Sequence, residues 1–351
     1  MERDVAAVCL RSFGPLLANV GQLLDAIAGP GAADGVAGAL ARVPASVTNF
    51  FGFEVSAAGA GADVLLQLRP STEPLALGTL AGGDDGVNRR LEELLSGAAM
   101  SDDASPLACK SVWVEYDLGV GYARRPGSGL PVPSLFCAPR HLAPPQNTYV
   151  HRALGASQRD AAVAMEIEHG LWPGAGAFQR GAMLSRASRP FRLCLVTTEP
   201  ERTLAELVRW VDDRVAWEAI AAPATEHASL SPHQSCVLDI ELRNGVVQPV
   251  IGVELSAAEA EELDVVVDAL GSYGLADPGW LLALAEWPGE DIALTTEAAQ
   301  QLGVRPPVEV LHRRVEYGVI RRVNHLKTTH RQDRTPSVKA YLGVRGGYRV
   351  S

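Results

Sequence analysis

The sequence predicts an α+β fold in which ten antiparallel strands form a closed β-barrel ringed by helices. Five pairs of strand-like segments recur along the 351 residues, and amphipathic helical segments separate each pair from the next. Each strand-like segment has one apolar and one polar face. Isolated hairpins are only marginally stable, so the five pairs must assemble into a sheet. Closing ten strands into a barrel removes both exposed sheet edges.

The chain begins with a helical segment at residues 16–27, whose apolar side chains follow helical spacing up to a Gly-Pro pair. The first predicted hairpin follows, with strands at residues 50–56 and 63–69 around a turn rich in Gly and Ala. Alternation places Glu54 and Asp63 on the polar faces of these strands.

The second hairpin is predicted within residues 111–138. Trp113, Glu115 and Asp117 share one face of its first strand, and the other face is apolar. The hairpin therefore presents an aromatic side chain and two acids on the same side.

The third hairpin is predicted at residues 178–185 and 190–197, where Arg192 alternates with apolar neighbours. The fourth comprises residues 235–242 and 248–255. An Asn-Gly dipeptide joins the two strands of this fourth hairpin. Asn-Gly between alternating segments is the strongest local hairpin signal in the chain.

The fifth hairpin has strands at residues 323–329 and 337–344 around a polar loop. Its polar faces carry His325, Lys327, Lys339 and Tyr341. Lys339 has two candidate acidic partners across the sheet, Glu254 and Asp239.

Helical segments separate the hairpins. They are expected around residues 87–96, from Ser157, at residues 204–215, from Ser256, from Asp277 and at residues 295–302. Because helices must cover the apolar faces of the strands, the polar faces point into the barrel. A barrel of ten strands is too wide for side chains to fill, so we expect a polar cavity of ligand size.

The prediction is a single domain spanning residues 1–351. The alternative is two α+β domains divided near residue 150, each with a sheet that is solvated on one face. The pattern of hydrophobic residues alone does not separate these two arrangements.

Composition limits the classes of function. Hydrophobic residues make up 47% of the chain and charged residues 21%, which is typical of a globular protein with a large core. The net charge of −10 argues against general binding to nucleic acid or to an anionic membrane. The five cysteines are scattered, and no signal peptide or membrane-spanning segment is recognisable. We therefore expect a cytoplasmic protein.

The order of helices and hairpins resembles that of the ABBA-type prenyltransferases, which transfer isoprenyl groups from a diphosphate to aromatic acceptors or peptide side chains. Three sequence strings add to this resemblance: ADVLLQL from position 62, RLCL from position 192 and VKAYLG from position 338. The resemblance implies a barrel of five αββα units. It also implies an allylic prenyl diphosphate as donor, and a small aromatic molecule or a peptide as acceptor, or else cyclisation of an isoprenoid.

The resemblance assigns roles to several residues. Glu115 and Asp117 are the candidate catalytic acids, and Glu115 is expected to hold or deprotonate the acceptor. Asp63 matches an acid that holds Mg²⁺ in magnesium-dependent members of the family. The candidate substrate-binding residues are Trp113, Arg192, His325, Lys327, Lys339 and Tyr341. Trp113 and Tyr341 are expected to shield a carbocation with their aromatic faces.

Strand alternation also predicts an excess of acids inside the barrel. Three basic residues, Arg192, Lys327 and Lys339, are opposed by Glu54, Asp63, Glu115, Asp117, Asp239, Glu241 and Glu254. Three explanations follow: Mg²⁺ is recruited by some of the acids, the substrate is cationic, or the barrel is a non-catalytic accessory protein that binds a ligand or peptide.

Overall fold

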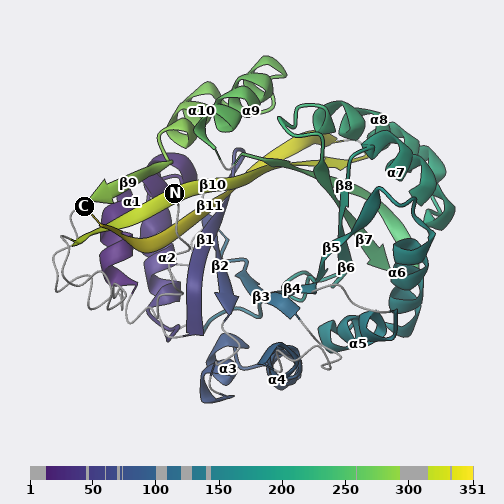
Figure 1. Cartoon of the computed structure of the whole chain (residues 1–351), viewed down its shortest axis with the longest axis horizontal. Helices are drawn as coiled ribbons and strands as arrows, with labels where there is room; N and C mark the ends of the chain where they lie inside the picture. Colours follow the sequence, from purple (N-terminus) through teal and green to yellow (C-terminus); the bar gives the residue numbers. More distant parts are fainter. Residues whose placement is uncertain are drawn as a thin grey trace.

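The computed structural model describes residues 13–44, 47–59, 61–68, 72, 74–99, 109–119, 129–139, 144–257, 259–292, 315–332 and 334–350. Its main feature is a closed antiparallel barrel of ten strands with helices outside (Figure 1). The strands pair as five hairpins: β1 Thr48–Ser56 with β2 Ala62–Leu68, β3 Cys109–Tyr116 with β4 Ser134–Pro139, β5 Ala175–Ala182 with β6 Phe191–Thr197, β7 Cys236–Arg243 with β8 Val246–Ser256, and β10 Val315–Arg331 with β11 Arg334–Val350. The predicted fold class is confirmed.

The barrel closes between its last and first strands. Strand β11 pairs with β1 in a register that joins Phe51 to Val344 and Ser56 to Lys339, and β10 pairs with β8. The ten strands therefore form one sheet, and the alternative with two separate sheets is wrong.

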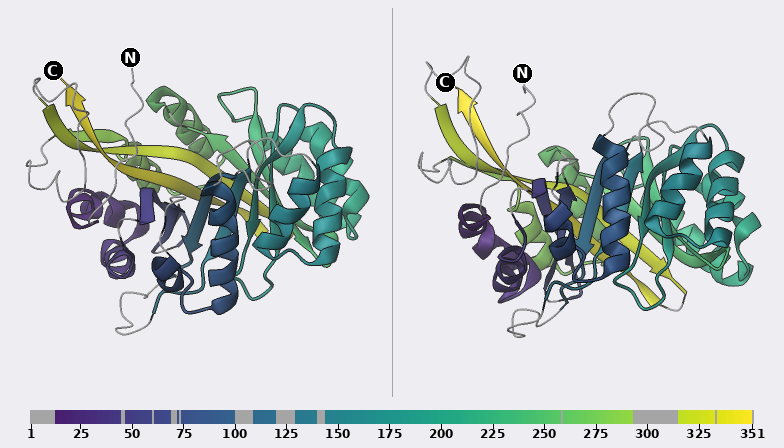
Figure 2. Two further views of the ribbon diagram at one scale, coloured as in Figure 1. Left: turned by 60° about the horizontal axis from the view of Figure 1, so that its bottom comes forward. Right: turned by 90° about the horizontal axis from the view of Figure 1, so that it is seen from below.

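The closing hairpin differs most from its prediction. Strands β10 and β11 each span 17 residues, and Figure 2 shows this hairpin extending beyond the other strands. A short strand, β9 (Gly289–Ile292), pairs with the extended part of β10. Both features were missed, because β9 has only four residues and Gly318, Arg321 and Arg322 interrupt the apolar alternation of β10. The helix expected at residues 295–302 lies outside the described residues.

The helices lie outside the barrel in both figures. They are α1 Gly14–Ala28, α2 Ala32–Leu40, α3 Pro74–Leu80, α4 Asp85–Ala99, α5 Pro144–Leu154, α6 Gln158–Gly170, α7 Pro200–Leu207, α8 Arg214–Ala228, α9 Ala260–Ser272 and α10 Pro278–Ala285. Ser157 and Asp277 cap α6 and α10, as their sequences predict. Helix α9 is capped by Glu259 instead of Ser256, through a reciprocal capping box with Glu262.

The hydrophobic core is a layer between the helices and the outer face of the barrel. Phe51 and Phe53 on β1 are fully buried there and pack edge to face, with ring centroids 5.6 Å apart. Trp287 packs against Phe53, and the Tyr116 hydroxyl donates a 2.7 Å hydrogen bond to the Leu80 carbonyl. This layer takes up the apolar faces of the strands and leaves the polar faces for the interior. Within the described residues, no helix has the length and apolar character needed to cross a membrane.

Candidate functional site

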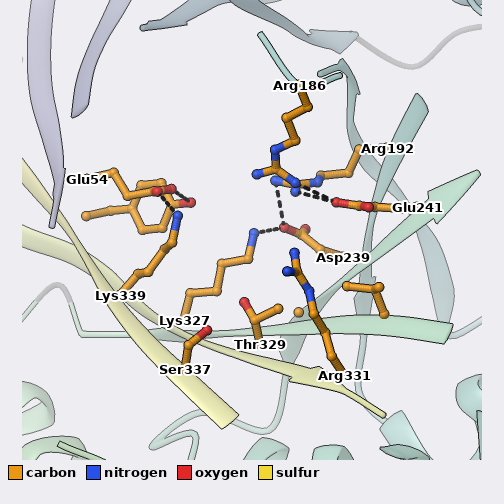
Figure 3. A pocket seen from close by; sticks show the side chains of 13 residues that line it. Glu54, Arg186, Arg192, Asp239, Glu241, Lys327, Thr329, Arg331, Ser337 and Lys339 are labelled. Carbon is orange, nitrogen blue, oxygen red and sulfur yellow. Dashed lines mark hydrogen bonds and ion pairs between the residues drawn. The ribbon is translucent and has the colours of Figure 1, made fainter. Parts of the chain in front are cut away.

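Polar side chains inside the barrel line a cavity of about 200 Å³ (Figure 3). They come from β1, β6, β7, β10 and β11 and from the loop between β5 and β6. The charged lining consists of five cations, Arg186, Arg192, Lys327, Arg331 and Lys339, and three acids, Glu54, Asp239 and Glu241. Because every strand alternates, helices bury one set of side chains while this set faces the cavity.

One ion-pair network in the cavity centres on Glu54. Lys339 and the Tyr341 hydroxyl both donate hydrogen bonds to the Glu54 carboxylate. Burial by itself raises the pKa of Glu54, but the charge of Lys339 and these hydrogen bonds lower it to about 2. Glu54 is therefore ionised at neutral pH. The Lys339 side chain is 27% exposed, which leaves its ammonium group accessible from the cavity.

A second network connects β6, β7 and β10. Lys327 donates to Asp239, and the Arg192 guanidinium lies 3.7 Å from the Asp239 carboxylate. Arg192 also donates to Glu241 at 2.9 Å, and Arg186 donates to the same Glu241 oxygen at 2.7 Å. Burial lowers the pKa of Lys327, but the neighbouring Asp239 raises it above its ordinary value. These contacts hold the buried cations in their charged form at fixed positions.

A glycine on β8 makes room for the second network. A Cβ atom at Gly252 would lie 2.7 Å from Lys327 Cε and 2.9 Å from Asp239 Cβ. The Lys327–Asp239 pair therefore occupies the space of the missing side chain.

Two polar side chains next to these networks have shifted pKa values. Burial and the nearby Asp239 raise the pKa of Glu254 to about 8. Burial and the charge of Lys327 lower the pKa of His325 to about 4. The neutral imidazole of His325 stacks on the Tyr341 ring, with centroids 4.1 Å apart.

Glu115 and Asp117 lie on the same strand face but have different surroundings. Glu115 is 2% exposed, and its Oε1 has no hydrogen-bond partner in the described part of the chain. Burial, together with the charges of Glu54 and Asp117, raises the pKa of Glu115 to about 8. Asp117 accepts a hydrogen bond from the Ser185 hydroxyl. Glu115 Oε1 is therefore a buried carboxyl oxygen that remains available to a ligand.

Asp63 is the cross-strand partner of Glu54. Its Oδ1 accepts a 2.8 Å hydrogen bond from the backbone N–H of Leu118. Burial, Glu54 and Asp117 raise the pKa of Asp63 to about 6, since nearby negative charge disfavours another carboxylate. A cation next to Asp63 would relieve this repulsion. The described residues contain no cluster of three or more metal-binding side chains, but Mg²⁺ often uses one or two carboxylates plus substrate phosphates.

Trp113 belongs to an aromatic patch on the inner face of the barrel. Its ring packs edge to face on Phe50, with centroids 5.6 Å apart, and its Nε1–H donates to the Ser111 hydroxyl at 3.1 Å. Phe136 is the cross-strand partner of Trp113, and its ring fills the space that a side chain at Gly181 would take. This patch can provide an aromatic wall that is separate from the Tyr341–His325 stack.

Comparison with known proteins identifies the architecture. No protein-family model and no curated protein sequence match the chain. Among solved structures, the prenyltransferase PriB in a ternary complex with L-tryptophan and dimethylallyl thiolodiphosphate aligns over 93% of this chain and 95% of its own, with a TM-score of 0.52 and 14% identity. The 5-dimethylallyl tryptophan synthase from Streptomyces coelicolor, in complex with DMASPP and Trp, aligns over 95% of both chains, with a TM-score of 0.50 and 16% identity. The fold is the ABBA prenyltransferase barrel.

The ABBA barrel brings some of the predicted site residues together. Four of the substrate-binding candidates, Arg192, Lys327, Lys339 and Tyr341, line the cavity. His325 is joined to them by stacking on Tyr341. The other candidates are on the inner faces of β2 and β3 or just after β3. The described residues that line this cavity do not include them: Asp63, Trp113, Glu115 and Asp117. The partner of Lys339 is Glu54, and neither of the acids considered from the sequence pairs with it.

Two cations of the barrel were missed, and within this cavity the cations outnumber the acids. Arg331 extends the two-residue period of Lys327 and Thr329, but the predicted strand ended before it. Arg186 lies in a loop, where no periodicity could place it. With these two included, five cations face three ionised acids.

Proposed function

We propose that the protein transfers a prenyl group from an allylic diphosphate to a small aromatic acceptor inside the ABBA barrel. The observation that carries this proposal is the convergence of five cationic side chains on one cavity, where they outnumber the ionised acids. A diphosphate carries about three negative charges, and a cluster of Arg and Lys is the usual protein site for such an anion.

The cationic cavity supplies the chemistry that the first step needs. Ionisation of an allylic diphosphate moves negative charge onto the leaving oxygens, so fixed donors aimed at those oxygens lower the barrier. Arg192 and Lys327 are held in place by Asp239 and Glu241, which limits their reorganisation during the reaction. Arg331, Lys339 and Arg186 are the more exposed cations and are best placed to meet the donor as it enters.

The second step, attack by the acceptor, involves β3. Trp113 and Phe50 provide aromatic faces for a carbocation and for an acceptor ring. Glu115 has a carboxyl oxygen without a partner among the described residues and a pKa of about 8, so its ionised form, which is populated as the pH approaches 8, is the form that would take a proton from the acceptor. Asp117 is already engaged by Ser185, and we assign it a positioning role.

We further propose that Asp63 can hold Mg²⁺ beside the donor. A bound Mg²⁺ would neutralise charge on the leaving diphosphate. The raised pKa of Asp63 and its position opposite Glu54, which lines the cavity, support this assignment.

The pairing of each lining acid with a cation favours a second candidate function, a non-catalytic binding protein whose interior is already neutralised. The two candidates differ in turnover. Only the enzyme releases diphosphate from a prenyl donor in the presence of an acceptor.

The first experiment is thermal unfolding with thiolodiphosphate analogues of dimethylallyl, geranyl and farnesyl donors, each with and without Mg²⁺. A ligand at a hundred times its dissociation constant stabilises the native state by about 2.7 kcal/mol, which raises the unfolding midpoint measurably. We expect one chain length to give the largest rise and Lys339→Ala to abolish it. The control is Arg152→Gln on the exposed surface of α5. A flat response to all donors contradicts the proposed donor.

Turnover is then measured by product mass spectrometry with the preferred donor and a panel of aromatic acceptors. Donor binding without any prenylated or cyclised product favours the non-catalytic alternative.

A further inference from the structure

A second cavity, of about 210 Å³, lies further along the closing hairpin. It is lined by Phe50, Ile320, Arg322, Asn324, Gly343 and Arg345. The proposed reaction assigns no role to its two arginines.

The register of the sheet places this second cavity on the same face as the first. Gly343 and Arg345 continue the alternation of Lys339 and Tyr341, which line the first cavity. Across the hairpin, Arg345 is paired with Ile320 and Gly343 with Arg322. Four residues of strand separate Tyr341 from Arg345, a distance of about 13 Å along β11. The two cavities therefore follow one another along the inner face of the sheet.

The charge of the second cavity differs from that of the first. Two guanidinium groups line it, and none of its described lining residues is acidic. Arg345 Nε is buried and has no hydrogen-bond partner in the described part of the chain. A buried donor without a partner is costly, and an anionic ligand would satisfy it.

An aromatic ring connects the second cavity to the proposed acceptor site. Phe50 lines the cavity and lies over Gly343, where an added Cβ would be 2.7 Å from Phe50 Cζ. The same Phe50 ring also packs edge to face against Trp113. A molecule that places an anionic group at Arg345 would therefore have its aromatic part beside the Phe50–Trp113 wall.

We propose that Arg345, with Arg322 beside it, binds a carboxylate of the acceptor, so that the acceptor is an aromatic acid. The planar guanidinium forks match the geometry of a carboxylate. The separation of about 13 Å between Tyr341 and Arg345 suits an acceptor whose reacting ring lies near the donor and whose acid group lies at the far end. This inference rests on the proposed function.

The test measures binding of matched acid and amide probes by isothermal titration calorimetry. The pairs are indole-3-propionate with indole-3-propionamide, and 4-hydroxyphenylpropionate with its primary amide. Each is titrated into the full chain with and without saturating dimethylallyl thiolodiphosphate. We expect at least one acid to bind about tenfold more tightly than its amide, the ratio typical of one charge-assisted contact.

Variants at Arg345 assign this preference to the second cavity. Arg345→Gln is expected to lower the affinity for the acid about tenfold and to leave the affinity for the amide unchanged. Arg345→Lys keeps the charge and is expected to recover part of the loss. Arg152→Gln on α5 is the surface control, and the thermal unfolding midpoint of each variant establishes that it is folded.

The inference is overturned if acid and amide bind equally, if no acid binds, or if folded Arg345→Gln keeps the preference for the acid. Donor binding separates this failure from failure of the proposed function. If dimethylallyl thiolodiphosphate still raises the unfolding midpoint, only the acceptor assignment is wrong. If the analogue has no effect either, the proposed donor is wrong as well.

Discussion

Lys339 and Glu54 form an ion pair across the seam where the last strand of the barrel pairs with the first. The hydroxyl of Tyr341, which is directly opposite Glu54 in the register, donates to the same carboxylate. A residue proposed to bind the donor thus also joins the two ends of the sheet. Its substitution should affect both ligand binding and stability.

Lys339→Met leaves the buried Glu54 carboxylate with the Tyr341 hydroxyl as its remaining donor in this network. Because half-paired buried charge is unfavourable, and because Lys339 is itself partly exposed, we expect the free energy of unfolding to fall by about 2 kcal/mol. The double variant Glu54→Gln/Lys339→Met should recover at least half of this loss. Urea unfolding at pH 7 measures both values, and equal stabilities for the single and double variants would show that the pair is not coupled.

Arg331→Gln should weaken donor binding without affecting stability. Arg331 lines the cavity but is exposed, so its removal should change the free energy of unfolding by less than about 0.5 kcal/mol. Loss of one cationic contact to the diphosphate should raise the dissociation constant of a thiolodiphosphate analogue about tenfold. The matched control is Arg334→Gln, since Arg334 is the exposed cross-strand neighbour of Arg331 and does not line the cavity. Similar losses in both variants would indicate a general surface-charge effect.

Glu115→Gln should stabilise the protein increasingly as the pH rises. The pKa of Glu115 is about 8 in the folded state against an ordinary value of 4.5, so the folded state retains a proton that the unfolded state releases. The contribution of Glu115 to stability is therefore complete below pH 4.5 and is lost as the pH rises through 8. Glutamine cannot ionise, and the stability difference in favour of the variant should grow between pH 5 and 8, by on the order of 3 kcal/mol, and then level off. Unfolding curves at several pH values measure this difference, and a constant difference would mean that Glu115 is ionised in the folded protein.

Gly252→Ala should disturb the Lys327–Asp239 pair. The added Cβ would lie within 3 Å of both side chains, so we expect overpacking to cost about 1–3 kcal/mol and donor affinity to fall. Gly176→Ala on β5 is the matched control, because a Cβ there would have no atom within 4 Å. The control variant should be as stable as the parent protein or slightly more stable. Equal effects at the two glycines would contradict the packing argument.

The fold could be predicted from the sequence because the barrel depends on local patterns of apolar and polar residues. Alternating segments marked all five hairpins, and the Asn244–Gly245 turn was readable because both residues adopt positive φ, 58° and 80°, as a tight hairpin turn requires. The short strand β9 was not predictable, since four residues give no usable period. Its position depends on the exposed edge of β10, which exists only in the folded protein.

The candidate site was predictable only in part. The alternation of side chains along each strand placed Glu54, Lys327 and Lys339 inside the barrel. The ion pairs, however, connect residues far apart in the chain, as with Lys339 and Glu54, which are 285 positions apart. The raised pKa of Glu254 is also a property of the assembled barrel, because burial and the nearby Asp239 produce it. Local pattern gives the direction of a side chain, whereas partner and protonation state require the three-dimensional arrangement.

The closure of the barrel by β11 has a consequence for how the chain reaches its native state. The residues that meet at the seam are as much as 293 positions apart, as with Phe51 and Val344, so β1 must wait for its partner until β11 has been synthesised. During translation the nascent chain has an unpaired strand edge on β1, and such edges favour aggregation. Contacts of such long range also slow folding. The ion pair between Lys339 and Glu54 therefore forms only once β11 is available to pair with β1. We expect a truncated chain lacking β11 to be captured by chaperones or proteases.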